Sequence, residues 1–220
     1  MNILIAEDHI VFRETLERAC ADVLRDSTVT SVSDGTAAIR FCQSQSFALF
    51  LLDLQLPDLD SFTVADIATA HMPNVAIIAL CSHCTEYTVY RAEKRRVRGF
   101  IDARTATISV LHEAITRVAA HGIYYSPTFL ELKAARKRNS MSFDKILSDR
   151  ELEVLSLIAA PFTDREIAAT LGISAQTAEK HRFNLLRKLG LPTTTELTRF
   201  ARDRGIIRRP APFSAPTAGS

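Results

Sequence analysis

The sequence predicts an α/β fold, a doubly wound five-stranded parallel sheet, followed by a smaller all-α domain of four helices. In residues 1–121, short apolar runs alternate with longer segments of helical spacing, whereas the segment after residue 147 carries only helical patterns. The length of 220 residues leaves room for a second domain, and a hydrophobic content of 47% is typical of chains that bury a core. A mostly disordered or collagen-like chain is therefore excluded.

Five short runs in the first half are apolar or β-branched, and we expect them to form buried strands. They are residues 2–6, 29–32, 47–52, 75–80 and 99–101. The segments between and after them are long enough for helices, at residues 9–24, 35–45, 61–71, 84–96 and 107–120. Strands separated by helices imply a parallel sheet with right-handed crossovers, and ligands of such sheets bind at the carboxyl ends of the strands.

Signals for helix starts are clear in the second half of the chain. Three pairs, each a hydroxyl residue with a glutamate three positions later, fit the capping box: Ser148 with Glu151, Thr163 with Glu166, and Thr193 with Glu196. A further helix is expected to begin at Ser174, while Gly172 and Gly190 are expected to end helices in the left-handed conformation. These signals predict four helices within residues 147–207.

The two halves differ in charge. Residues 1–121 hold 11 Lys and Arg against 15 Asp and Glu, a net charge of −4, whereas residues 122–220 hold 16 against 10, a net charge of +6. Residues 122–146 contain helix breakers and a basic polar stretch, and we interpret them as a partly helical linker. Residues 208–220, rich in Pro, Ala, Ser and Thr, are expected to form a disordered tail. A basic second half is consistent with a polyanionic partner.

The sequence shows neither a signal peptide nor a run of about 18 apolar residues, so we expect a cytoplasmic protein with no membrane partner. The four cysteines are too few and too scattered for a disulfide framework, which fits a reducing compartment. The motif Cys81-Ser82-His83-Cys84 lacks a second ligand pair, so a zinc or redox role is disfavoured. The basic face of segment 84–96, with Arg91 and Arg95, is most simply interpreted as solvated.

Three acidic residues stand at the ends of expected strands. Glu7 and Asp8 follow the first strand, and Asp53 follows the third, so a doubly wound sheet would bring them to one edge. Carboxylates in contact raise one another's pKa, and a hard divalent cation with oxygen ligands, above all Mg²⁺, relieves this repulsion. The placement therefore predicts a metal site, at which an aspartate could act as nucleophile toward a phosphoryl group. Capping of neighbouring helices is the alternative role of strand-end acids.

The run Glu7-Asp8-His9 and the run Leu51-Leu52-Asp53-Leu54-Gln55-Leu56-Pro57-Asp58-Leu59-Asp60 resemble the receiver domain of bacterial two-component response regulators. The resemblance covers residues 1–121 and implies a flavodoxin-like fold. It also implies that Asp53 is the phosphoacceptor for a sensor histidine kinase, that Glu7 and Asp8 help to bind Mg²⁺, and that the backbone carbonyl of Gln55 completes the metal site.

The sequence departs from this family at two of its switch positions. The family has Thr or Ser after the fourth strand, where this chain has Cys81, with Ser82 one place late. The family has Lys after the fifth strand, where this chain has Ala103, which can neither donate a hydrogen bond nor carry charge. Phe100 does occupy the aromatic switch position. We therefore expect a receiver that binds Mg²⁺ and signals by phosphate weakly or not at all.

The most specific signal lies in residues 147–207. Asp164-Arg165-Glu166-Ile167-Ala168, Leu171-Gly172-Ile173-Ser174, Thr177-Ala178-Glu179-Lys180-His181 and Asn184-Leu185-Leu186-Arg187-Lys188-Leu189-Gly190 resemble the LuxR-type helix-turn-helix. A helix of this kind lies in the major groove of double-stranded DNA, where Lys and Arg reach phosphates and polar side chains reach base edges. The candidate DNA-binding residues are Gln176, Thr177, Glu179, Lys180, His181, Arg182 and Lys188. A four-helix protein-binding module with a solvated basic face is the alternative.

Together these features predict a DNA-binding transcription regulator of the NarL/FixJ type, phosphorylated on Asp53. By resemblance it would act as a homodimer and would not be an enzyme. A first alternative keeps the DNA-binding domain and makes the receiver independent of phosphate. A second alternative, a Mg²⁺-dependent phosphotransfer enzyme with Asp53 as nucleophile, lacks a second catalytic acid at Gln55 and leaves the second domain unexplained.

Overall fold

The computed structural model describes residues 1–95, 97–160 and 162–207. Within them the chain divides into two compact units, one formed by residues 1–84 and 89–131, the other by residues 85–88 and 132–207. The first unit therefore extends about ten residues beyond the boundary expected at residue 121. The expected disordered tail, residues 208–220, lies outside the described residues.

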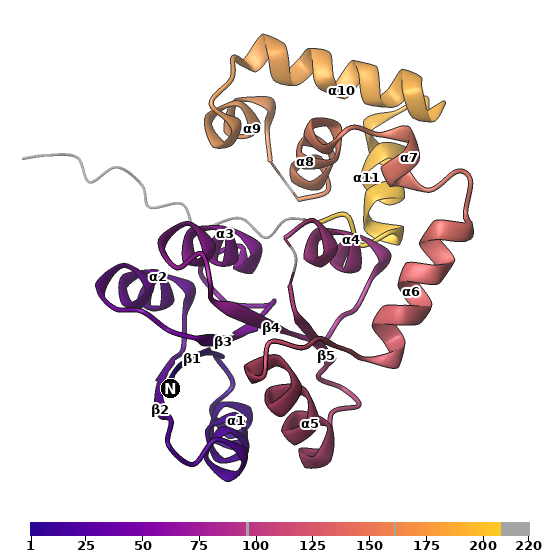
Figure 1. Ribbon diagram of the computed structural model, residues 1–220. Helices are drawn as coiled ribbons and strands as arrows, with labels where there is room; N and C mark the ends of the chain where they lie inside the picture. Colours follow the sequence, from indigo (N-terminus) through magenta and orange to yellow (C-terminus); the bar gives the residue numbers. More distant parts are fainter. Residues whose placement is uncertain (96, 161, 208–220) are drawn as a thin grey trace, which may run out of the picture. The chain divides into compact units, whose positions relative to one another are not determined.

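The first unit is built on a parallel sheet with the strand order β2-β1-β3-β4-β5-β6 (Figure 1). Its strands are β1 (Asn2–Ala6), β2 (Thr28–Val32), β3 (Leu49–Asp53), β4 (Ala76–Cys81), β5 (Gly99–Asp102) and β6 (Tyr124–Tyr125). The order runs outward from β1 in both directions, which is the doubly wound arrangement that the sequence predicts.

The sixth strand corrects the prediction of five strands. Tyr124 and Tyr125 pair with Gly99 and Phe100 of β5, within a segment that the sequence places in the linker. A strand of two residues is too short to show a hydrophobic period, so the sequence pattern could not reveal it. Its place is fixed instead by tertiary contacts, because the Tyr125 hydroxyl donates to the Val97 carbonyl oxygen at 2.9 Å, across 28 residues of sequence.

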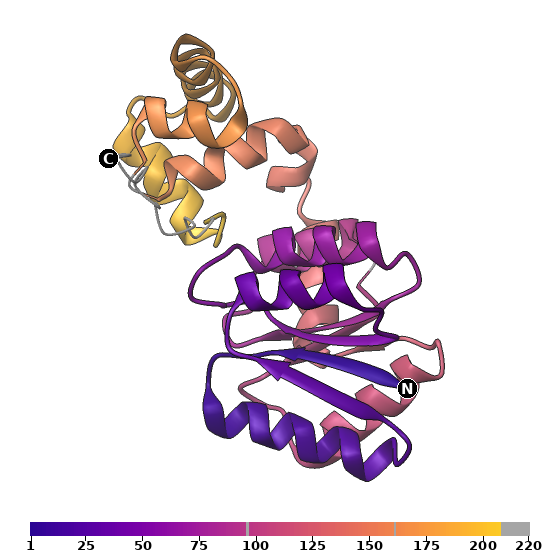
Figure 2. The ribbon, with the colours of Figure 1, turned by 90° about the vertical axis from the view of Figure 1, so that its left-hand side faces the viewer.

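Helices cover both faces of the sheet (Figures 1 and 2). One face carries α1 (Ile10–Val23) and α5 (Ile108–Ala119), and the other carries α2 (Gly35–Ser44), α3 (Ser61–His71) and α4 (Glu86–Lys94). Strands covered on both sides must be apolar throughout, which explains the nearly continuous hydrophobic runs of β1, β3 and β4. A core forms where alternate strand residues meet α1 and α5, as Ile5, Leu51 and Ile78 do with Leu16 and Ile115.

Two arginines of the basic segment 84–96, Arg91 on α4 and Arg95 directly after it, are half-buried, which corrects the prediction of a solvated face at these positions, whereas Lys94 is exposed. Arg91 donates to both carboxylate oxygens of Asp60 at 2.9 Å, and its guanidinium lies 4.3 Å from the centre of the Phe62 ring. Arg95 lies over the same ring and donates to Asp66 at 2.8 Å. These arginines therefore attach α4 to α3, because a planar guanidinium can pair with a carboxylate and stack on an aromatic ring together.

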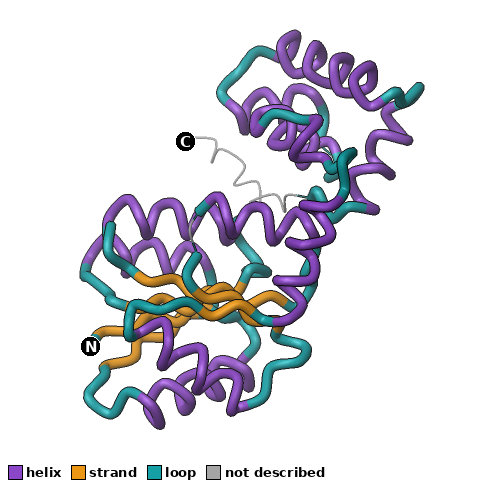
Figure 3. The backbone as a smooth tube through the Cα atoms, turned by 45° about the vertical axis from the view of Figure 1, so that its right-hand side comes forward, coloured by secondary structure: helices purple, strands orange, loops and turns teal. Residues whose placement is uncertain are grey.

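The second unit is all-α, as predicted (Figure 3). Its helices are α7 (Phe143–Ile146), α8 (Asp149–Ile158), α9 (Asp164–Leu171), α10 (Ala175–Leu189) and α11 (Thr194–Asp203). Buried leucines and isoleucines on α8 to α11 form its core, among them Leu155, Ile167, Leu185 and Leu197. The segment expected as a partly helical linker contains α6 (Pro127–Arg138) and α7.

The predicted helix ends of the second unit are found in the structure. Complete capping boxes start α8 and α9, whereas at α11 the Thr193 hydroxyl accepts from the Glu196 backbone and the Glu196 carboxylate faces Arg199 at 3.9 Å. Gly172 and Gly190 end α9 and α10 with φ of 63° and 66°, the left-handed region that glycine adopts without steric cost.

Gly172→Ala should lower the free energy of unfolding by about 1 kcal/mol, because the left-handed conformation strains a residue with a Cβ. An added Cβ would meet no atom within 4 Å, so the loss of stability would come from backbone strain and not from a steric clash. Gly172→Asn is the matched control and should lose less, since asparagine tolerates this conformation. Urea denaturation measures both variants, and equal losses for Ala and Asn would contradict the prediction.

Candidate functional sites

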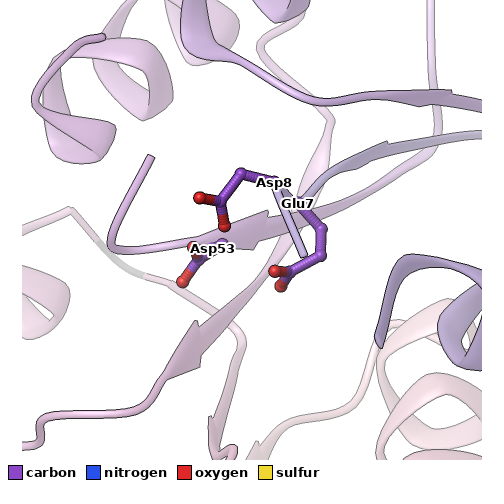
Figure 4. Close-up of side chains that lie close together, drawn as sticks. All are labelled: Glu7, Asp8 and Asp53. Carbon is purple, nitrogen blue, oxygen red and sulfur yellow. The ribbon is translucent and has the colours of Figure 1, made fainter. Parts of the chain in front are cut away.

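Three carboxylates meet at the carboxyl edge of the sheet (Figure 4). Glu7 and Asp8 directly follow β1, and Asp53 is the last residue of β3, which pairs with β1. One ligand oxygen from each residue lies within 4.8 Å of the other two. The side chains of Glu7 and Asp53 are buried, whereas Asp8 is exposed, so the cluster opens to solvent on the Asp8 side.

Hydrogen bonds hold the acids in place. The backbone N–H of His9 donates to Glu7 Oε1, and that of Gln55 donates to Asp53 Oδ1, both at 3.1 Å. Arg13, one turn into α1, donates to the Glu7 carbonyl oxygen at 2.7 Å. Burial, followed by the Asp53 carboxylate, raises the pKa of Glu7 to about 7, although the His9 N–H and the Arg13 charge act in the opposite direction.

This donor set fits Mg²⁺. The cation prefers carboxylate and carbonyl oxygens and keeps several water ligands, which suits a cluster with one exposed acid. Two buried carboxylates that repel each other are stabilised when a divalent cation joins them. Glu7, Asp8 and Asp53 therefore provide side-chain oxygens suited to holding such an ion.

The aspartates at the end of β3 and in the loop after it have three different roles. Asp53 belongs to the acidic cluster with Glu7 and Asp8 (Figure 4). Asp58 accepts from the backbone N–H groups of Gly35 and Thr36 at 2.7 and 2.8 Å and so caps the start of α2. It also accepts from the Thr36 hydroxyl at 2.7 Å, and the hydroxyl and the two N–H groups lower the pKa of Asp58. Asp60 caps α3 through the Phe62 N–H at 2.9 Å. Helix capping, the alternative role for acids in this region, thus applies to Asp58 and Asp60.

The predicted switch residues of the fourth strand lie around Gln55. Cys81 ends β4 and is 1% exposed. The Ser82 hydroxyl donates to Gln55 Oε1 at 3.0 Å, and Gln55 Nε2 lies 2.9 Å from His83 Nδ1. The hydroxyl that is one place late in the sequence therefore contacts the amide side chain two residues after Asp53.

The remaining two switch positions lie at the end of β5. Phe100 is fully buried and packs against Phe129 of α6, with 4.9 Å between ring centroids. Ala103 follows β5, and its N–H donates to the Cys81 carbonyl oxygen at 2.9 Å, which fixes the backbone where the family has lysine.

Sequence reasoning missed two residues of this region, Arg13 and His83. Arg13 could have been found, because it lies one helical turn after His9 and so faces the end of β1. His83 drew attention only as part of the Cys81–Cys84 motif, and its contact with Gln55 could not be predicted, since it joins two loops that are 28 residues apart in sequence.

The second unit contains a helix-turn-helix. Its first helix, α9, ends at Gly172, and Ser174 caps α10 by accepting from the Thr177 N–H at 3.1 Å. Ala178 and Leu185 face the core, and the opposite face of α10 is polar and open. Of the predicted DNA-binding residues, four are exposed near the start of α10: Gln176, Thr177, Glu179 and Lys180.

The other three predicted DNA-binding residues are less open or already paired. His181 and Arg182 are both half-buried. Arg182 donates through Nε and Nη2 to one oxygen of Asp164 at 3.0 and 2.5 Å, which ties α10 to α9. The Lys188 Nζ donates to Glu151 Oε2 at 2.8 Å. Glu151 also completes the capping box of α8, and the bonds from Lys188 and Ser148 hold its pKa below the usual range.

Two family models match the two units. Residues 3–116 match the response regulator receiver domain, and residues 145–201 match the luxR family of bacterial regulatory proteins. The chain thus belongs to the response regulators that join a receiver to a LuxR-type DNA-binding domain.

Relatives match most of the length of the chain. The chain is 31% identical to the transcriptional regulatory protein MctR of Rhizobium johnstonii over 72% of this chain and 73% of that protein. It is 24% identical to the Fimbriae Z protein of Salmonella typhimurium over 94% of this chain and 98% of that protein. The fold is similar to that of RcsB from Salmonella enterica bound to the promoter rprA with the phosphomimetic BeF₃⁻, with a TM-score of 0.68 and 22% identity over 91% and 97% of the two chains. Across the described part of the chain, no helix has the length and apolar character to cross a membrane.

The raised pKa of Glu7 should make folding stability depend on pH when divalent cations are absent. An unfolded glutamate releases its proton near pH 4.5, whereas folded Glu7 keeps it to about pH 7, so the free energy of unfolding falls as pH rises through this window. The shift corresponds to roughly 3 kcal/mol.

Glu7→Gln should remove this dependence. We expect the difference in unfolding free energy between wild type and Glu7→Gln to change by about that amount between pH 4.5 and 7. Glu14→Gln, which removes a carboxylate at an exposed position of α1, is the matched control. A constant difference for Glu7→Gln would show that Glu7 titrates normally.

Proposed function

We propose that this chain regulates transcription by binding double-stranded DNA through α10 and that its receiver accepts a phosphoryl group on Asp53 from a sensor histidine kinase. The observation that carries the proposal is the meeting of Glu7, Asp8 and Asp53 at the carboxyl edge of the sheet, with Asp53 at the end of β3. Action on DNA would place the protein in the cytoplasm.

The chain's own residues position the reaction. Asp53 offers a carboxylate oxygen as nucleophile, held by the Gln55 N–H at 3.1 Å. Glu7, Asp8, Asp53 and the Gln55 carbonyl would hold Mg²⁺, which supplies charge neutralisation on the transferring oxygens. Arg13 adds positive charge that acts on Glu7.

A second candidate function keeps the DNA-binding role and makes the receiver independent of phosphate. Ala103 and Cys81 favour this second function. In the family, a lysine and a hydroxyl at these positions bind the phosphoryl group, whereas alanine provides no hydrogen-bond donor for the phosphoryl oxygens. In this case a protein partner, a small ligand or the expression level would control the protein.

We also propose that the protein acts as a homodimer. Two copies bound to a palindromic site make the second binding event intramolecular, which raises the overall affinity and fixes the spacing of the half-sites. The basic net charge of residues 122–220 supplies the electrostatic part of DNA binding.

Treatment with Mg²⁺ and acetyl phosphate should add one phosphoryl group to the wild type and none to Asp53→Asn, as measured by intact mass. Asp26→Asn, an exposed acid outside the cluster, is the control and should react as the wild type does. Uptake by Asp53→Asn would exclude Asp53 as the acceptor.

DNA affinity and oligomeric state, measured in the same samples, separate the two candidate functions. Tighter DNA binding after phosphorylation supports a working switch, whereas strong and unchanged binding supports the phosphate-independent receiver. Ala103→Lys should strengthen the response, because its ammonium can pair with the phosphoryl oxygens.

Lys188→Ala should weaken DNA binding for all sequences and reduce the slope of log affinity against log salt by about 1, if Lys188 contacts a phosphate. Arg117→Ala is the matched control, because it removes one exposed positive charge from α5 of the receiver. Fluorescence anisotropy at several salt concentrations measures the slope, and an unchanged slope would remove Lys188 from the phosphate contacts.

A further inference from the structure

The two cysteines at the end of β4 lie in contact. Cys81 is the last residue of the strand and is 1% exposed, while Cys84 lies in the loop after it and is half-buried. The Cys84 thiol donates to the Cys81 carbonyl oxygen with an Sγ–O distance of 3.5 Å. It also hydrogen-bonds to the Cys81 thiol, and this contact, together with burial, raises the pKa of Cys81 far above its ordinary range.

The environments of the two thiols give them different roles. Cys81 is shielded from solvent and held in the protonated form, so a reagent in solution reaches Cys84 first. Cys81 then needs to reach only the neighbouring Cys84 sulfur. Cys20 and Cys42 are both buried, on α1 and α2, so they are poorly placed for attack from solution.

We propose that Cys81 and Cys84 form a reversible intramolecular disulfide by exchange with a small disulfide of the glutathione type. The Cys84 thiolate attacks one sulfur of that molecule, its S–S bond breaks, and the first small thiolate leaves. The Cys81 sulfur then attacks Cys84, and the second small thiolate leaves. The two protein thiols are oxidised, the small disulfide is reduced, and the two protons pass to the departing thiolates.

The loop that this disulfide would close contacts the side chain of Gln55. Ser82 and His83 lie between the two cysteines and contact the two ends of the Gln55 side-chain amide. Closing the ring restrains this loop and so changes the position of Gln55, two residues after Asp53. The effect of the disulfide on Mg²⁺ binding rests on the proposed function, whereas formation of the disulfide does not.

Peptide mapping of the full-length folded protein tests the bond. Cleavage before Asp66 and Asp102 releases residues 66–101, which contain Cys81 and Cys84 and no other cysteine. After treatment with oxidised glutathione this peptide should have lost two hydrogen atoms, and dithiothreitol should restore them. Free thiols in the peptide, a glutathione adduct without the internal bond, or a bond formed only in urea would each overturn the proposal.

Variants test the order of attack. Cys81→Ser should trap glutathione on Cys84, because the second thiol is missing, and Cys84→Ser should gain neither an adduct nor a bond. Cys42→Ala is the matched control and should still form the bond between Cys81 and Cys84. An adduct on Cys81 in Cys84→Ser would overturn the assigned order.

Calorimetric titration of Mg²⁺ into the reduced and oxidised wild type tests the link to the metal cluster. We expect a difference in affinity of at least about threefold, since ring closure shifts the loop that contacts Gln55. Equal Mg²⁺ affinities would overturn the proposed effect of the disulfide on the metal site. Peptide mapping alone decides whether the disulfide forms.

Discussion

The pairing of β1 with β3 is the constraint on which the acidic site depends. Their register places Ala6 beside Leu52, so the next residues along the two strands, Glu7 and Asp53, must emerge side by side. A slip of one residue would exchange the faces of every side chain on the strand, and the apolar core on both sides of the sheet opposes it. Packing energy in the core thus holds two carboxylates together at a buried edge, and burial, followed by the Asp53 charge, raises the pKa of Glu7.

Periodicity and strand order made the architecture of the first unit predictable from the sequence. Runs buried on both faces and the intervening helices determine the doubly wound sheet, and the sheet determines where acids at strand ends meet. The glycine positions of the second unit were equally predictable, because the left-handed conformation at Gly172 and Gly190 suits a residue without a side chain.

Long-range contacts limited the prediction elsewhere. Asp58 and Asp60 look alike in the sequence, and only the fold directs Asp58 to α2 and Asp60 to Arg91 of α4. Two residues of β6 carry no period, and nothing local shows that Arg91 of α4 stacks on Phe62. The proximity of two cysteines follows from their spacing, but the burial that distinguishes them does not.

The ion pair between Lys188 and Glu151 has a consequence for how the protein searches a genome. A phosphate that engages Lys188 must compete with a carboxylate already bound to it at 2.8 Å. Random DNA offers mainly phosphate contacts, whereas a target site adds contacts to base edges. If Lys188 contacts a phosphate, competition by Glu151 therefore lowers the affinity for random and target DNA alike, and the contacts to base edges alone set the ratio between the two affinities.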